Sequence, residues 1–315
     1  MISNQYETYP SYIRLAKSGE LKFRAQKALE ILKSCTLCPH KCEVNRSEDV
    51  YGFCKIGRYA YIASYFPHTG EEECIKGWRG SGTIFFSGCN LQCVFCQNWD
   101  ISHHRTGEPT DANRLASIMI ELQKVGCHNI NLVTPTHIIP QFLEALCIAV
   151  KMGLRLPIVY NSGGYDSVNA LKFLEGVIDI YMPDFKIWDS EIAARLLHSP
   201  DYPEVARKVI KEMHRQVGDL EINNEGIAKR GVLLRHLVLP SNLAGTRELA
   251  RWLVDEVSKN IYVNLMNQYH PDGYVTYPAM QENYKELARL VNRDEFKQAY
   301  DDARSSGIHR FNSNS

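Results

Sequence analysis

Three cysteines in one short loop have the spacing of iron–sulfur ligands. Cys89, Cys93 and Cys96 follow a C-x3-C-x2-C pattern directly after an apolar, strand-like run. Iron–sulfur clusters are held by cysteine thiolates at tight spacings of this kind. Three thiolates would cap three irons of a cubane and leave the fourth open, as a reactive metal site requires. The alternative interpretation is a zinc site completed by His103 or His104.

Four further cysteines lie upstream of this loop. Cys35, Cys38, Cys42 and Cys54 follow a C-x2-C-x3-C-x11-C pattern. Four thiolates form a closed site, which suits either a second iron–sulfur cluster or a structural zinc ion. Because a saturated metal offers no place for a substrate, such a site would serve folding or electron relay.

The elements that must position these cysteines alternate between strand and helix. Six strand-like runs cover residues 83–87, 129–133, 157–161, 178–182, 232–238 and 261–266. Helical patterns cover residues 111–125, 140–152, 166–174, 191–217 (two helices) and 246–258. This alternation predicts parallel βαβ units. The strands are rich in Ile, Val and Leu without strict alternation, so we expect them to be buried on both faces. Periodicity alone fits an open sheet or a barrel.

The chain divides into three expected parts. Residues 1–80 form an N-terminal helix, broken near Gly19, and a cysteine-rich metal-binding extension. Residues 81–275 carry the alternating strands and helices, and residues 276–315 form a helical, charged tail.

Composition excludes some classes of partner. Lys plus Arg equals Asp plus Glu at 36 each, so the net charge is zero and gives no electrostatic argument for binding of nucleic acid or of an anionic membrane. No apolar run approaches the roughly 18 residues of a membrane span. The N-terminus lacks a basic region followed by an apolar one. We therefore expect a cytoplasmic protein.

The central loop also resembles a known signature. With Gly88 before its first cysteine and the aromatic Phe95 before its third, it is similar to the loop of the radical SAM superfamily. The resemblance implies an α/β fold with a partial (βα)6 TIM-like barrel. It further implies a [4Fe–4S] cluster whose open iron chelates S-adenosylmethionine (SAM). Reductive cleavage of SAM then yields a 5′-deoxyadenosyl radical that abstracts hydrogen from a substrate.

Further segments resemble the pyruvate formate-lyase activating enzyme-like branch of that superfamily. They are residues 35–39, 80–89, 133–137, 159–165, 181–186 and 235–240, spread over most of the chain from residue 35 to 240. Two segments depart from the pattern. The Gly-Gly-Glu segment that binds the methionine amino group in many members is replaced by residues 134–137, without a carboxylate. The activating enzymes' Cys-His-Asn is Cys96-Gln97-Asn98 here.

Polar residues near the ends of the predicted strands complete the candidate site. Side chains at the carboxyl ends of barrel strands point toward the ligand. The expected catalytic residues are Asp184, Lys186, Arg235 and His236. Asp184 and Lys186 resemble the Asp-x-Lys segment of the activating enzymes, although a buried structural ion pair is an equal alternative. The residues expected to bind cofactor are Gly88, Asn98, Thr134, Thr136, His137 and Asn161.

Three functional classes follow. The first is a radical SAM enzyme that acts on a small molecule or a peptide in a closed chamber. The second is an activating enzyme for a glycyl radical enzyme, and the third is a non-catalytic metal-binding redox sensor. Both enzyme classes need SAM and an electron donor such as flavodoxin or ferredoxin.

Overall fold

The structure is a computed structural model that describes residues 9–312. The outer ends of the expected parts, residues 1–8 and 313–315, lie outside the described residues. The part boundaries after residues 80 and 275 stay predictions.

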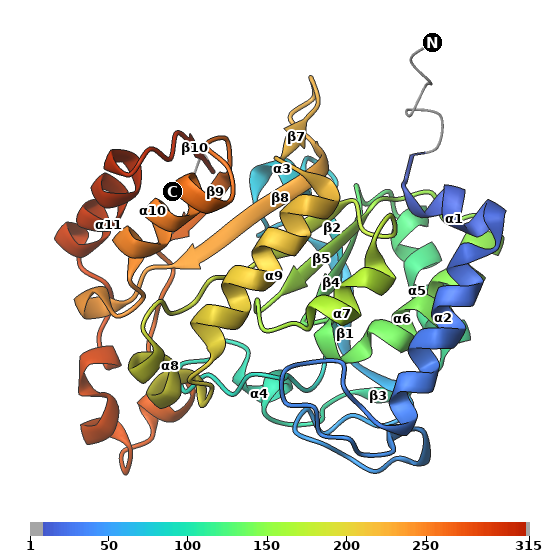
Figure 1. Cartoon of the computed structure of the whole chain (residues 1–315), viewed down its shortest axis with the longest axis horizontal. Coiled ribbons are helices and arrows are strands. Elements are labelled where there is room, and N and C mark those ends of the chain that lie inside the picture. Colours follow the sequence, from blue (N-terminus) through green and yellow to red (C-terminus); the bar gives the residue numbers. More distant parts are fainter. Residues whose placement is uncertain (1–8, 313–315) are drawn as a thin grey trace.

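Six parallel strands alternate with helices and form the centre of one sheet, which confirms the predicted α/β fold (Figure 1). The strands are β2 (Ser81–Phe86), β4 (Ile130–Val133), β5 (Ile158–Ser162), β6 (Ile180–Pro183), β8 (Ala228–Leu237) and β9 (Tyr262–Met266). Their order in space follows their order in the chain, as in a partial barrel.

Helices cover the outer face of these strands. They are α5 (Ala112–Lys124), α6 (Ile139–Lys151), α7 (Val168–Leu171), α8 (Ser190–Leu197), α9 (Tyr202–Val217) and α10 (Thr246–Glu256). Side chains alternate across a strand, so Ile84, Leu132 and Tyr160 pack outward in the main core. The carboxylate of Asp111 accepts from the Arg114 N–H at 2.8 Å and begins α5, as the sequence predicts.

The N-terminal part begins with two helices, α1 (Tyr12–Ser18) and α2 (Glu20–Glu30). Gly19 adopts φ +83° between them, which confirms the predicted break. The loop after α2 carries the four upstream cysteines. It lies at the same end of the molecule as the short helix α4 (Trp99–Ser102), which follows the central cysteine loop (Figure 1).

Several edge elements were not predicted. The strands β1 (Ala60–His68) and β3 (Glu108–Thr110) extend the sheet beyond β2 in antiparallel fashion. The strand β7 (Glu221–Ile222) pairs with β8. The tail contains the helix α11 (Arg293–Ser305), as predicted, and then the unpredicted strand β10 (Arg310–Phe311), which pairs in parallel with β9.

A segment between β1 and β2 fills the inside of the barrel at the amino ends of the parallel strands. His68, at the end of β1, pairs with Ser81, at the start of β2. From there the chain forms α3 (Glu73–Lys76), whose Cys74 and Ile75 are buried. They pack in a separate core against inward-facing strand residues: Val159, Ile180, Met182 and Leu233. The barrel is therefore closed at this end by its own chain.

Within the described residues, no helix is long and apolar enough to cross a membrane.

Candidate active site

The central cysteine loop leaves the carboxyl end of β2 through Gly88. Gly88 adopts φ +76°, and a Cβ atom there would lie 2.4 Å from the carbonyl oxygen of Cys54. Only glycine fits both constraints. Cys93 is buried, while Cys89 and Cys96 are half-buried. The loop thus presents three thiols from one tight turn at the end where barrel enzymes place their chemistry.

The environment of these thiols suits thiolate ligands. The Leu91 N–H donates to Cys89 Sγ at 3.3 Å, and the Ser102 hydroxyl lies 3.1 Å from Cys96 Sγ. Hydrogen bonds to sulfur of this kind stabilise and tune iron–sulfur clusters. Burial raises the pKa of Cys93 to about 12, so the free thiol holds its proton until a metal displaces it. The three donors therefore fit a cluster with one open iron.

The zinc alternative finds no support in the same region. Ser102 lies between Cys96 Sγ and His103 Nδ1, with the histidine 2.8 Å from the serine hydroxyl. The His103 ring also stacks on Trp99 at 3.6 Å between centroids. Across residues 9–312, no three Cys, His, Asp or Glu side chains converge on a position for a single metal ion.

Four predicted residues form one polar network beneath the loop. Asp184 accepts from Arg235 Nε at 2.8 Å and from Lys186 Nζ at 2.7 Å. Arg235 Nη2 donates to Asn161 Oδ1 at 2.7 Å. Burial alone would raise the pKa of Asp184, but the two cations outweigh it and lower that pKa below its ordinary value. The carboxylate is therefore ionised and shared between two cations.

The network approaches the cysteine loop at Lys186. Burial alone would lower the pKa of Lys186, but the carboxylate of Asp184 outweighs it and raises that pKa. Gly163 lies between the cysteine loop and Lys186. A Cβ atom added to Gly163 would be 3.2 Å from Leu91 Cδ1 in the loop and 3.6 Å from Lys186 Cε. A permanently charged ammonium group therefore stands beside the cysteines.

Two acids that sequence reasoning left out complete the interior. Glu71 Oε1 accepts from Asn131 Nδ2 at 3.0 Å, and its Oε2 lies 4.0 Å from Arg235 Nη1. Glu72 Oε1 accepts from Asn264 Nδ2 at 2.8 Å, while its Oε2 has no partner among the described residues. Burial and the neighbouring Glu72 raise the pKa of Glu71 to about 8.

These acids had a weak sequence signal. Residues 71–73 read Glu-Glu-Glu, which is typical of a solvated loop. Their partners are far away along the chain, so only the fold reveals that two of the three carboxyl groups point into the barrel.

Two predicted cofactor residues lie at the same strand ends. Thr134 follows β4 with φ +58°, and its N–H donates to the Asn161 carbonyl oxygen at 2.9 Å. A non-glycine residue in this conformation is strained, which is frequent at functional sites. Asn161 joins Thr134 to the Arg235 network.

Three other predicted residues form hydrogen bonds outside the Asp184 network. Thr136 donates to Asp166 at 2.7 Å. His137 Nε2 lies 2.9 Å from the Ser87 carbonyl oxygen, and burial lowers the pKa of His137 to about 3. His236 points to the opposite face of β8 from Arg235.

The ring nitrogens of His236 contact the Phe185 carbonyl oxygen at 2.6 Å and the Thr246 hydroxyl at 3.0 Å. Because alternate residues of a strand face opposite ways, the structure does not bring His236 to the Asp184 network.

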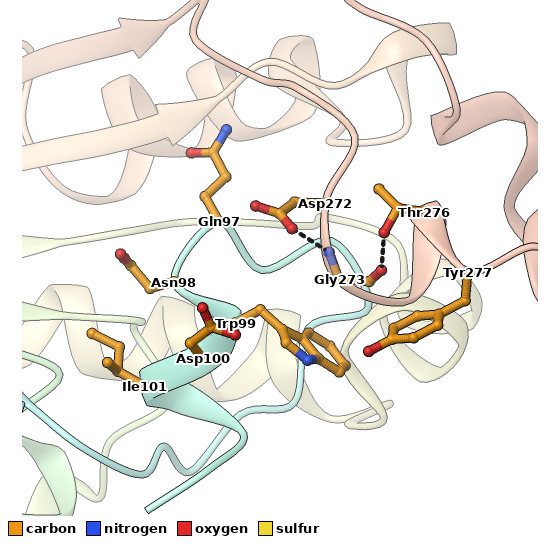
Figure 2. A pocket seen from close by; sticks show the side chains of 9 residues that line it. All are labelled: Gln97, Asn98, Trp99, Asp100, Ile101, Asp272, Gly273, Thr276 and Tyr277. Atoms are coloured by element: carbon orange, nitrogen blue, oxygen red, sulfur yellow. Dashed lines mark hydrogen bonds between the residues drawn. The ribbon is translucent and has the colours of Figure 1, made fainter. Parts of the chain in front are cut away.

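A cleft of about 420 Å³ borders the cysteine loop (Figure 2). It lies between the residues directly after Cys96 and the segment 268–277, which follows β9 and is called the cover segment below. Its lining comprises Gln97, Asn98, Trp99, Asp100, Ile101, Asp272, Gly273, Thr276 and Tyr277. Asn98, predicted to bind cofactor, therefore faces this cleft.

The cover segment lies directly on the cysteine loop. Gln97 Nε2 donates to the Gln268 carbonyl oxygen at 2.9 Å, and the rings of Phe95 and Tyr269 are 6.2 Å apart. A Cβ atom on Gly273 would lie 2.8 Å from the Val94 carbonyl oxygen. The cover segment thus covers one side of the candidate site.

Comparison with known proteins adds a family match. A model described as the Radical SAM superfamily matches residues 83–237, which include the cysteine loop and five of the six parallel strands. "Uncharacterized protein MJ0674" of Methanocaldococcus jannaschii is 33% identical over 298 residues, covering 91% of this chain and 79% of that protein. A solved structure, "Structure of TYW1 with a lysine-pyruvate adduct bound", aligns at a TM-score of 0.38 and 11% identity, over 65% of this chain and 72% of that one.

Proposed function

Because the chain belongs to the radical SAM superfamily and is an enzyme, we propose that it acts on a small polar molecule or a short peptide in a closed chamber. When bound, the [4Fe–4S] cluster and SAM supply reductive cleavage of the sulfonium and a 5′-deoxyadenosyl radical that abstracts hydrogen. The protein contributes binding, orientation and exclusion of side reactions.

The cysteine loop would hold the cluster through Cys89, Cys93 and Cys96. The strand ends beneath it would hold SAM, with Asn161 and the backbone at Thr134 as polar contacts. SAM carries a carboxylate, and a charged ammonium group is a suitable partner for it. Lys186 stands beside Cys93 and stays protonated, so it is the proposed anchor of that carboxylate.

Asp184 would act on these contacts indirectly. It holds both Lys186 and Arg235 by hydrogen bonds below 3 Å, so it sets where the two cations point. A preorganised group loses less freedom when a ligand binds.

The observation that supports the small-substrate proposal is that the candidate site is covered on two sides. Glu71 and Glu72 reach its polar network from the amino end of the barrel, where they accept hydrogen bonds from Asn131 and Asn264. The cover segment, with Gln268 and Gly273, covers the cysteine loop from another side. A closed, charged interior suits a small polar substrate better than the exposed backbone of a large protein.

The second candidate is an activating enzyme for a glycyl radical enzyme. The Asp184–Lys186 pair favours it, because that pair resembles the Asp-x-Lys segment of the activating enzymes. In either case a one-electron donor, such as flavodoxin or ferredoxin, is proposed as the source of the electron.

Deuterium transfer separates the two candidates. The reconstituted enzyme, SAM and dithionite are incubated anaerobically with extract from source cells grown in deuterated medium. The extract is first divided by ultrafiltration into small-molecule and protein fractions. Deuterium in 5′-deoxyadenosine, measured by mass spectrometry, then reports hydrogen abstraction from a component of that fraction.

Labelled 5′-deoxyadenosine from the small-molecule fraction is the expected result. Label from the protein fraction alone would refute the closed-chamber proposal and support the activating role. A Cys93→Ala variant is the control in both arms, because it removes one cluster ligand.

A further inference from the structure

The four upstream cysteines meet at one small cavity. Cys35, Cys38, Cys42 and Cys54 line a space of about 10 Å³ together with Arg46 and His137. The cysteines come from a loop of 20 residues that folds back on itself between α2 and β1. Cysteines that are up to 19 positions apart in the sequence therefore line the same cavity.

Two of the four sulfur atoms accept hydrogen bonds. Arg46 Nη1 donates to Cys35 Sγ at 3.6 Å, and the Phe53 N–H donates to Cys42 Sγ at 3.4 Å. Thiols are weak acceptors, whereas metal-bound thiolates are regularly supported by such donors.

Arg46 is a buried cation that lacks an anionic partner. Its residue is 1% exposed, and its Nη2 donates to the His137 carbonyl oxygen at 2.8 Å and to the Gly57 carbonyl oxygen at 3.4 Å. Its Nε has no partner, and it forms no salt bridge with any residue from 9 to 312. A buried charge left unpaired costs several kcal/mol, on the order of 3–5 for a broken buried pair.

We propose that the four thiolates bind a metal centre whose negative charge is balanced by Arg46. Four thiolates around Zn²⁺, or around a [4Fe–4S]²⁺ cluster, both carry a net charge of −2. Binding releases four thiol protons to solvent and forms four metal–sulfur bonds. The guanidinium group then faces the anion that its burial requires.

Two kinds of metal centre fit four thiolates. A zinc ion at about 2.3 Å from each sulfur holds the sulfurs close together, whereas a cubane accepts more widely spaced sulfurs. Metal and sulfide content therefore distinguish the two.

The proposed centre also supports the catalytic loop. His40 Nε2 lies 2.9 Å from the carbonyl oxygen of Asn90, which stands between the first two loop cysteines. The Cys54 carbonyl oxygen packs on Gly88. Adding the intervening bonds places the Cα atoms of Cys54 and Cys89 at most about 10 Å apart. Loss of the centre should therefore loosen the loop.

Metal analysis of the full chain tests the centre independently of the proposed function. The Cys89→Ala/Cys93→Ala/Cys96→Ala variant removes the central cluster, and it is reconstituted anaerobically with iron and sulfide, with zinc present. We expect this variant to bind metal. About four irons with sulfide per chain would identify a cluster, and about one zinc per chain would identify a zinc site. A further Cys38→Ser/Cys42→Ser change should abolish this metal, whereas Cys147→Ser should not.

Metal retained after Cys38→Ser/Cys42→Ser, or absent from the folded triple variant, would overturn the proposal. Circular dichroism establishes that each variant is folded.

Arg46 is tested in the same triple variant. Arg46→Met should lower the chelator concentration that removes half of the metal by about tenfold or more, as changes around metal ligands do. Arg46→Lys keeps the charge and should restore most of that loss. Arg58→Met is the matched control, because Arg58 lies in the same loop but pairs with Glu144. If Arg46→Met lowers the melting temperature and leaves chelator resistance unchanged, Arg46 is only a structural residue.

Discussion

Neutralising Asp184 tests whether the network beneath the cysteine loop is one energetic unit. In an Asp184→Asn variant, Arg235 and Lys186 lose the anion that both contact below 3 Å. The side chains are only 13%, 17% and 22% exposed for Asp184, Arg235 and Lys186. Removing one partner of a buried ion pair costs about 3–5 kcal/mol, because the remaining charge stays desolvated.

This cost converts to a measurable change in melting temperature. The entropy of unfolding is about 2.1 cal/mol/K per residue, or about 0.66 kcal/mol/K for 315 residues. We therefore expect Asp184→Asn to melt about 5–8 °C below the unchanged protein. The assay is thermal unfolding by circular dichroism at pH 7, on protein reconstituted to equal iron content.

The matched control breaks an ion pair near the surface. Arg58 and Glu144 are 27% and 30% exposed, so Glu144→Gln should cost at most about 1 kcal/mol, or about 1.5 °C. A drop for Asp184→Asn no larger than for this control would refute the reasoning. A Lys186→Met change made on top of Asp184→Asn should cost less than it does alone, because the two residues share the interaction.

Three further outcomes are expected. Cys93→Ala should abolish 5′-deoxyadenosine formation while the upstream metal stays bound; retained product would exclude Cys93 as a cluster ligand. Glu71→Gln should flatten the pH dependence of the unfolding free energy. Burial raises the pKa of Glu71 from 4.5 to about 8, so the folded state holds the proton more tightly, and stability is lost as pH rises through that range. Denaturant midpoints from pH 5 to 9 measure this, and equal slopes in both proteins would contradict it. Thr136→Val should cost about 1–3 kcal/mol, because Asp166 loses a buried donor, and should leave SAM affinity unchanged; calorimetric titration measures the affinity. A large loss of affinity would instead give Thr136 a cofactor role.

The parallel strands and their helices were predictable because their signals are local. An apolar run, a helical period and a cap such as Asp111 or Gly19 each act within a few residues of the chain. The cysteines that we propose as cluster ligands were equally visible, since close spacing within one loop is what such a cluster requires. Asp184 and Lys186 are two residues apart, so even their pairing was within reach.

The remaining features depend on contacts between distant residues. In the sequence, Glu71 belongs to an acidic run that is typical of a solvated loop, but β4 and β8 bring Asn131 and Arg235 beside it. Arg46 has no distinguishing neighbour in the sequence, yet the fold buries it among four cysteines. His236 was expected beside Arg235, but a strand turns neighbouring residues to opposite faces, and α10 supplies its partner Thr246.

The cover segment that lies on the cysteine loop has a consequence for the synthesis of the protein. Gln268 and Gly273, which lie on the loop, are synthesised about 170 residues after Cys96. At about 5–20 residues per second, translation of that stretch takes roughly 9–34 s. During this interval the growing chain presents its three thiols without their cover. A cluster delivered in this interval would therefore meet three thiols that are open on that side, whereas in the completed protein the cover segment already lies over them there.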